Sequence, residues 1–227
     1  PENRFFTRTG LLKMWESPFP GIKEICHSQL QFPQFMGAQG IIFKVAPLLN
    51  APGRMEKPDP ALDLLLCNNK ESAPLLVKNL SSWNAKRKNK ENEISKMAIQ
   101  RVKELYGNDL PPVLVIDGYD WHLGVIGIVA AKMTQEFNRP SAVLSIQPDG
   151  VASASARAIP GFNWHKALFE CRDLFSRWGG HANAAGFSIA KENIDLLRNK
   201  LNENVSAFQD TTIQTNTLPP IDVAFSE

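Results

Sequence analysis

The residues best suited to binding an anion lie within positions 153–186. This stretch holds a Ser-Ala-Arg triplet with Ser155 and Arg157, and a Gly-Gly-His triplet of Gly179, Gly180 and His181. Glycines let the backbone approach an anion, a hydroxyl can donate a hydrogen bond, and a guanidinium presents paired donors that match phosphate oxygens. A Gly-Gly pair usually marks only a turn. The occurrence of all these residues within one α/β pattern nevertheless favours a phosphodiester ligand.

A second candidate for anion binding is the segment 45–54, VAPLLNAPGR. Each of its prolines, Pro47 and Pro52, removes a backbone donor and restricts the residue before it. We therefore expect a loop here and not a continuous helix. The loop either only connects two helices or presents Asn50 and Arg54 to an anion.

Composition narrows the class of protein. The chain has 227 residues, enough for one large or two modest domains, and 43% of them are apolar. Its net charge of +2 is ordinary, so affinity for nucleic acid must come from a local arrangement of basic groups. No apolar run approaches the length of a membrane span and no secretory signal is present.

The cysteines indicate a reducing compartment. Their number is odd, they are widely spaced, and no C-x-x-C pair occurs among Cys26, Cys67 and Cys171. We expect buried free thiols, neither disulfides nor a zinc site, in a cytoplasmic protein.

The first hundred residues have helical patterns, expected near residues 5–17, 21–30 and 59–67, the last with Asp59 as N-cap and Pro60 at the first helical position. A much longer pattern covers residues 73–106 and would span about 50 Å. Its middle is basic, with Lys86, Arg87, Lys88 and Lys90. These cations form either a solvated face or a rail for a nucleic-acid backbone.

Beyond the break at residues 107–112, strand and helix patterns alternate. We expect strands at 113–117, 142–146, 151–157 and 187–190, and helices at 123–137, 163–177 and 192–208, with Asn163 as an N-cap. Residues 148–150, Pro-Asp-Gly, suit a hairpin turn, and 211–220 is a polar linker. The fold class is α/β, a small mixed sheet flanked by helices and preceded by a helical region with one long connecting helix.

Several other residues could either bind a ligand or have only a structural role. Trp121 and His122 could stack on a base or cap the domain. Gly124, at the start of a helix, could offer amides to an anion or allow close packing against the sheet. His27 and His165 lack neighbouring ligand-type residues and are interpreted as structural.

Three segments together resemble a known family. They are residues 120–130 (DWHLGVIGIVA), 153–161 (SASARAIPG) and 179–187 (GGHANAAGF). They are similar to the C-terminal half of the RecJ family, bacterial single-strand-specific 5′ to 3′ DNA exonucleases of the DHH phosphoesterase superfamily. Segment 48–54 and the long helix resemble that family's interdomain connection, and the resemblance covers nearly the whole chain.

The resemblance implies that catalysis belongs to another domain. In this family, Asp and His side chains of an N-terminal DHH domain hold two Mn²⁺ or Mg²⁺ ions, which activate water to attack the phosphodiester. This sequence has no Asp-His-His triplet and no Asp-x-Asp. We expect no metal bound by this chain and no activity from it alone. Both ends of the sequence look like cuts through a longer polypeptide.

The domains implied are a helical remnant after the DHH domain (1–72), the connecting helix (73–106), the DHH-associated nucleic-acid-binding domain (107–208), and a linker with the start of an OB-fold (209–227). The residues implied to bind substrate phosphates are Ser155, Arg157, Gly179, Gly180, His181, Asn50 and Arg54. At Leu48, relatives more often carry arginine. The implied partners, in DNA repair and recombination, are single-stranded DNA, the DHH domain, and a single-strand-binding protein or helicase.

Two alternatives stay open. The chain could be a non-catalytic nucleic-acid-binding or scaffold module, or part of another DHH-family phosphodiesterase or oligoribonuclease. The Gly-Gly-His segment alone fits many members of the superfamily, and the preference for DNA over RNA comes only from the resemblance.

Overall fold

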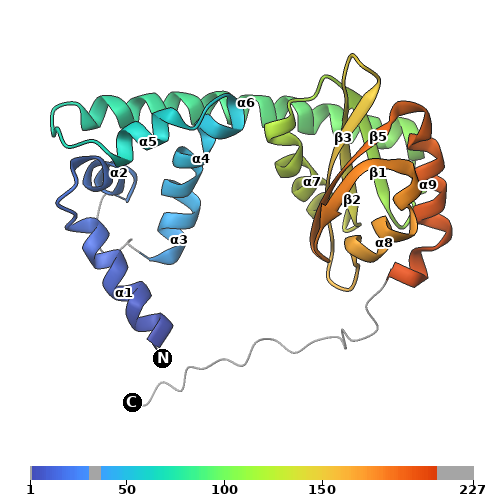
Figure 1. Cartoon of the computed structure of the whole chain (residues 1–227), viewed down its shortest axis with the longest axis horizontal. Coiled ribbons are helices and arrows are strands. Elements are labelled where there is room, and N and C mark those ends of the chain that lie inside the picture. Colours follow the sequence, from blue (N-terminus) through green and yellow to red (C-terminus); the bar gives the residue numbers. More distant parts are fainter. Residues whose placement is uncertain (1, 31–36, 209–227) are drawn as a thin grey trace. The chain divides into compact units, whose positions relative to one another are not determined.

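The computed structural model describes residues 2–30 and 37–208. The chain forms two compact units: unit 1 comprises Pro1–Lys96 and Trp121–Ile126, and unit 2 comprises Met97–Asp120 and Gly127–Glu227. The long helix α6, Ala73–Tyr106, therefore has residues in both units, as does α7, Leu123–Phe137 (Figure 1). The boundary between the units falls inside these helices, not at their ends.

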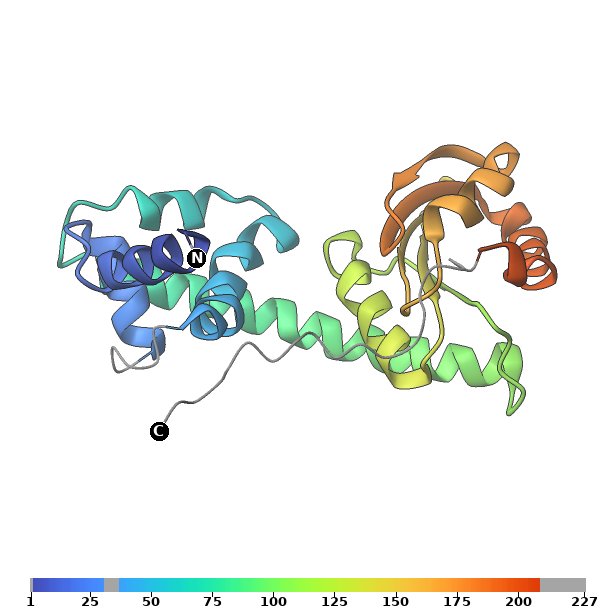
Figure 2. The same cartoon turned by 90° about the horizontal axis from the view of Figure 1, so that it is seen from below.

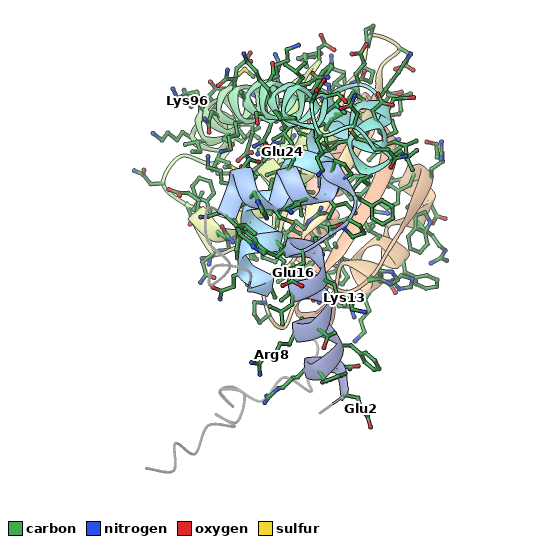
Figure 3. All side chains as sticks on the ribbon, turned by 90° about the vertical axis from the view of Figure 1, so that its left-hand side faces the viewer. Glu2, Arg8, Lys13, Glu16, Glu24 and Lys96 are labelled. Carbon is green, nitrogen blue, oxygen red and sulfur yellow. The ribbon has the colours of Figure 1, made fainter. Side chains whose placement is uncertain are left out.

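Unit 1 is helical over its described residues. Besides the first part of α6, its elements are α1 (Glu2–Trp15), α2 (Pro20–Leu30), α3 (Ala38–Gly40), the π-helical turn η2 (Ile41–Val45), α4 (Ala46–Met55) and α5 (Asp59–Leu65). Residues such as Ile25, Leu64 and Leu80 form its core. Helix α1 buries none of its residues, and Figure 3 shows charged side chains such as Arg8 spaced along it.

The expected loop at residues 45–54 is wrong, because this segment is helix α4. Pro47 lies in the first turn, where a missing N–H needs no partner. Pro52 lies inside the helix and deprives the Leu48 carbonyl of a donor, a cost of about 3 kcal/mol. Burial of Leu48, Ala51 and Pro52 compensates for this loss, since burying one large apolar side chain contributes about 1.5–3 kcal/mol.

The expected cap of α5 is also displaced by one residue. Pro58, with helical dihedral angles, is the N-cap, and its carbonyl accepts from the N–H groups of Ala61 and Leu62. Asp59 is therefore inside the first turn, where its charge still complements the helix dipole.

Unit 2 contains a five-stranded mixed sheet, which confirms the expected fold class. The strands are β1 (Leu114–Tyr119), β2 (Ser141–Ile146), β3 (Val151–Arg157), β4 (Phe175–Gly180) and β5 (Ala184–Ala190). Their order is β1-β2-β3-β5-β4; β1 and β2 are parallel and the other neighbours are antiparallel. The remaining elements are α8 (Trp164–Glu170), α9 (Ile194–Glu203) and the short turns η3 (Arg172–Leu174), η4 (Lys191–Asn193) and η5 (Val205–Phe208).

Alternate residues of each strand point to opposite faces of the sheet, and different helices pack against the two faces. One face carries Ala152, Leu144 and Phe187 and packs with α8 and α9 into one hydrophobic core. Figure 2 shows α8 and α9, orange to red, on this side of the strands. On the other face, Gly127 of α7 lies against β3. Further along the sheet, Gly186 of β5 and Gly179 of β4 are exposed on this same face.

The expected helix 163–177 is wrong in its second half. Asn163 is the N-cap, accepting a hydrogen bond from the Lys166 N–H, but α8 ends at Glu170 and the chain then forms η3 and strand β4. An irregularity between Phe175 and Arg177 interrupts the two-residue alternation of β4, so the sequence shows no clear strand period there. The expected helix 192–208 is divided into η4, α9 and η5. The linker 211–220 and the expected OB-fold start lie outside the described residues.

Two simpler expectations have clear outcomes. Cys26, Cys67 and Cys171 are free and buried, as predicted, and burial raises the pKa of the Cys26 and Cys171 thiols. Among the residues that the structure describes, no helix has the length and apolarity that crossing a membrane requires.

Candidate nucleic-acid interface

Ser155 and Arg157 lie two residues apart on β3, so their side chains share one face of the sheet. The Arg157 Nη1 donates to the Ser155 Oγ at 3.0 Å and to the Ala156 carbonyl at 2.8 Å. Helix α7 leaves room for this pair, because a Cβ on Gly127 would lie 3.1 Å from both the Ser155 Oγ and the Arg157 Nη2. The guanidinium is thus held in one orientation over the serine.

Gly179, Gly180 and His181 end β4 and begin the turn into β5. Gly180 has a φ of 143°, and a Cβ there would lie 2.5 Å from the Ala184 carbonyl oxygen. The His181 N–H donates to the same oxygen at 2.8 Å. At Gly179, by contrast, a Cβ would meet nothing within 4 Å. Gly180 is therefore required by the turn, whereas Gly179 leaves a surface open.

The sheet brings the two triplets onto one face, with β5 between them. Ser155 and Gly179 are both register partners of Gly186. Two strand spacings therefore separate their Cα atoms, about 10 Å. The sequence predicts that the two triplets lie near each other at a loop following a helix, whereas the strand register places them in a row across three strands.

A parallel row lies one step further along the strands, where Ser188 pairs with both Ser153 and Arg177. We name the surface formed by both rows and the adjoining arginine the polar sheet face, consisting of Ser153, Ser155, Arg157, Arg177, Gly179, Gly186 and Ser188. The small serine side chains and the glycines, which have no side chain, let a ligand approach the backbone, and the two guanidiniums can bind anions. Sequence reasoning missed four of these residues, although Ser and Gly at alternate positions of residues 151–157 and 184–190 signal such a face.

The expected residues Asn50 and Arg54 belong to unit 1, whereas the polar sheet face belongs to unit 2. Both side chains are exposed on α4. The Arg54 Nη1 donates to the Gly124 carbonyl at 3.3 Å, and a Cβ on Gly124 would lie 1.8 Å from the Arg54 carbonyl oxygen. Of the two interpretations of Gly124, close packing is the one that the contacts favour, although its partner is α4.

Trp121 and His122 are engaged within unit 1. The Trp121 residue is only 5% exposed, so no face of its ring is free for a base. The His122 Nδ1 accepts from the Gly124 N–H at 3.2 Å, and its Nε2 lies 3.2 Å from the Met55 carbonyl oxygen. These contacts favour the capping interpretation of both residues over base stacking.

The basic cluster of α6 is largely occupied by partners on the same helix. Arg87 pairs with Glu91 at 2.6 Å, Lys90 pairs with Glu93 at 2.9 Å, and the Lys86 ammonium lies over an aromatic ring. Such pairs within one helix are typical of a solvated face. The contacts therefore favour that interpretation over a rail for nucleic acid.

A buried ion cluster lies at the opposite edge of the sheet. Asp117, at 7% exposure, accepts from the Arg101 Nη2 at 3.1 Å and also from Arg198. Burial alone would lower the pKa of Arg101, but the hydrogen bond to Asp117 and the attraction to that carboxylate outweigh burial and raise it. Residues 2–30 and 37–208 contain no group of three or more His, Cys, Asp or Glu side chains that could hold a metal ion.

Comparison with known proteins first defines a class. The DHHA1 domain model matches residues 110–207, which make up most of unit 2. Over nearly its whole length the chain is further similar to the C-terminal region of RecJ, the single-stranded-DNA-specific exonuclease. This finding confirms the resemblance inferred from the sequence.

The individual matches cover most of this chain but only part of each relative. RecJ of Bacillus subtilis (strain 168) is 36% identical over 203 residues, 89% of this chain and 26% of that protein. RecJ of Escherichia coli (strain K12) is 30% identical, over 93% of this chain and 38% of that protein. The structure of RecJ from Thermus thermophilus in complex with Mn²⁺ matches 92% of this chain and 30% of its own with a TM-score of 0.79 and 25% identity.

Proposed function

We propose that this chain is the substrate-binding portion of a RecJ-like 5′ to 3′ single-stranded-DNA exonuclease and grips phosphates of the strand. The observation that carries the proposal is the row of Ser155, Gly186 and Gly179 across three strands, with Arg157 beside it. Similarity to proteins named single-stranded-DNA-specific exonucleases supplies the substrate class. In this proposal Arg157 is the main cation, and the Gly179, Gly180 and His181 backbone supplies amide donors.

Hydrolysis is assigned to a DHH domain that this sequence does not contain. RecJ structures are described with Mn²⁺ and with Mg²⁺, and ions of this kind would activate water in the complete enzyme. The residues of this chain do not fit such ions, since it has neither an Asp-His-His triplet nor an Asp-x-Asp. We also propose the division of the chain into residues 1–72, 73–106, 107–208 and 209–227. In this proposal Asn50 and Arg54, which precede the long helix, contact substrate phosphates. A single-strand-binding protein or helicase partner also stays a prediction.

Substitution of Arg157 tests the proposal. In fluorescence anisotropy with a labelled oligothymidylate, Arg157→Ala should weaken binding by about 1.5–3 kcal/mol, the value of a charge-assisted contact. The dependence of log affinity on log salt should flatten by about 0.7, one phosphate on a single strand. Ser155→Ala, which removes the hydroxyl beside the guanidinium, should produce a smaller loss.

Thermal melting serves as the control for folding of both variants. If the wild-type chain fails to bind the oligonucleotide, or if both folded variants bind as the wild type does, the proposal is wrong.

A further inference from the structure

We propose that Arg177, together with Ser188 and Ser153, forms a second phosphate subsite on the polar sheet face. The proposal rests on the proposed function, because it needs a nucleic-acid strand to cross this face. It adds a residue that lies outside both triplets and outside every segment that carried the family resemblance. The ligand is a second phosphodiester of the same single strand.

The irregularity in β4 is what aims Arg177 at this face. Phe175 pairs with Ile189 and Arg177 pairs with Ser188, so two residues of β4 correspond to one step of β5. The next residue, Trp178, pairs with Phe187 and packs against the hydrophobic core. Because neighbouring strand residues point to opposite faces, Arg177 is directed away from that core. Without the extra residue, Arg177 would point into the core face.

Arg177 is also available for a ligand. It is exposed, and within the described ranges 2–30 and 37–208 its side chain makes no hydrogen bond, ion pair or ring contact. The arginines of the opposite sheet edge differ, because Arg101 and Arg198 both bind the Asp117 carboxylate. Beside Arg177 on the neighbouring strands, Ser188 and Ser153 are partly exposed, and their hydroxyls can donate to an anion.

Arg177 and Arg157 are far enough apart to contact two different phosphates. Arg157 pairs with Ala184 and Arg177 with Ser188, four residues apart along β5, and the two arginines are two strands apart. Strand geometry therefore places their Cα atoms about 16 Å apart. A strand that contacts both would cross the face diagonally over several nucleotides. Because the two contacts are distant, their contributions to binding should be additive.

The test measures binding of the 227-residue chain to a labelled oligothymidylate of about 20 nucleotides over a range of salt concentrations. Arg177→Ala should weaken binding about three- to tenfold at low salt and flatten the salt dependence by about 0.7. The Arg157→Ala/Arg177→Ala double variant should show the product of the two single fold-changes. Arg177→Glu should weaken binding more than Arg177→Ala, because it replaces attraction with repulsion.

Arg172→Ala is the matched control for charge. Arg172 is exposed and contacts Phe169, whose ring meets that of Trp178 on the other side of the sheet. We expect its binding to stay within twofold of the wild type. If Arg177→Ala binds no more weakly than Arg172→Ala while Arg157→Ala loses affinity, the second subsite is wrong and the proposed function stands. If the Arg157 variant also binds normally, the proposed function itself fails.

Discussion

Gly179 and Gly180 are adjacent in β4, yet each is glycine for a different physical reason. Gly180 has a left-handed φ of 143° and no space for a Cβ beside Ala184 and Ala185. Gly179 has open space at that position and lies in the row with Ser155 on the polar sheet face. The first glycine allows an anion to approach the backbone, and the second allows the strand to turn.

Alanine substitutions should separate these roles. Gly180→Ala should lower the free energy of unfolding by about 2 kcal/mol or more, because both the dihedral strain and the backbone contact oppose a Cβ. Gly179→Ala should leave stability within about 0.5 kcal/mol of the wild type but weaken oligonucleotide binding, since its methyl group would occupy the approach to the backbone. Urea unfolding and anisotropy measure the two effects. Equal stability of both variants would contradict this assignment.

At the scale of the element, the β1 edge of the sheet is protected by side chains of two helices. The outer edge of β1 is closed by side chains: the Tyr106 hydroxyl donates to the Val115 carbonyl at 3.0 Å and accepts from its N–H at 3.2 Å. Asn202 makes the equivalent pair of bonds with Val113 at 2.8 and 3.2 Å. Such closure prevents an edge strand from pairing with another chain. It also ties β1 to α6 and α9.

The Tyr106 hydroxyl makes this closure dependent on pH. Burial raises the pKa of Tyr106, although the Val115 bond and Arg198 oppose the shift. In the unfolded chain the phenol ionises near pH 10, so between that pH and the folded pKa the unfolded state holds fewer protons and stability falls as pH rises. Below about pH 9 the contribution of Tyr106 should be fully present.

The Tyr106→Phe variant should therefore lose about 1–3 kcal/mol of unfolding free energy at pH 8, because the Val115 N–H loses its acceptor, although the Val115 carbonyl keeps the Arg198 Nε as a donor. The difference in unfolding free energy between wild type and variant should shrink as pH rises from 9 to 11. Chemical denaturation at several pH values measures both. A difference that stays constant over this range would contradict the role of the hydroxyl proton.

At the scale of the whole molecule, the region that the DHHA1 domain model matches, residues 110–207, is one part of a chain with two compact units. The matched relatives are much longer, since this chain spans 26% of the Bacillus subtilis protein and 38% of that from Escherichia coli. This chain therefore allows the proposed binding role to be tested apart from the rest of such a protein.

We predict that the purified chain does not hydrolyse single-stranded DNA, even with Mn²⁺. Hydrolysis of this type needs several carboxylate and imidazole ligands to hold the ions, and the sequence has neither of the acidic motifs expected of a DHH domain. The measurement is release of acid-soluble nucleotides from a labelled strand. Metal-dependent release that EDTA abolishes, and that persists through further purification, would show that this chain carries a catalytic centre.

Much of the fold follows from the sequence alone. The bounds of α6, α7 and β3 agree with those expected, as does the Asn163 cap. Each depends on a signal within a few residues, such as helical spacing of apolar side chains, a firm break or a side chain that bonds the first turn. The co-occurrence of Ser155 and Arg157 with the Gly-Gly-His triplet favours an anion ligand, which stays a prediction.

Only the tertiary structure decided which residues distant in sequence lie side by side. Local rules failed at α4, where burial of Pro52 and its neighbours overrides the preference of proline for a loop. They failed again at β4, whose strand conformation depends on pairing with β5. The register that places Gly186 between Ser155 and Gly179, and the irregularity that turns Arg177 outward, arise from contacts between residues distant in sequence. Strand pairing and side-chain burial are settled together when the sheet forms, so no short window of residues specifies them.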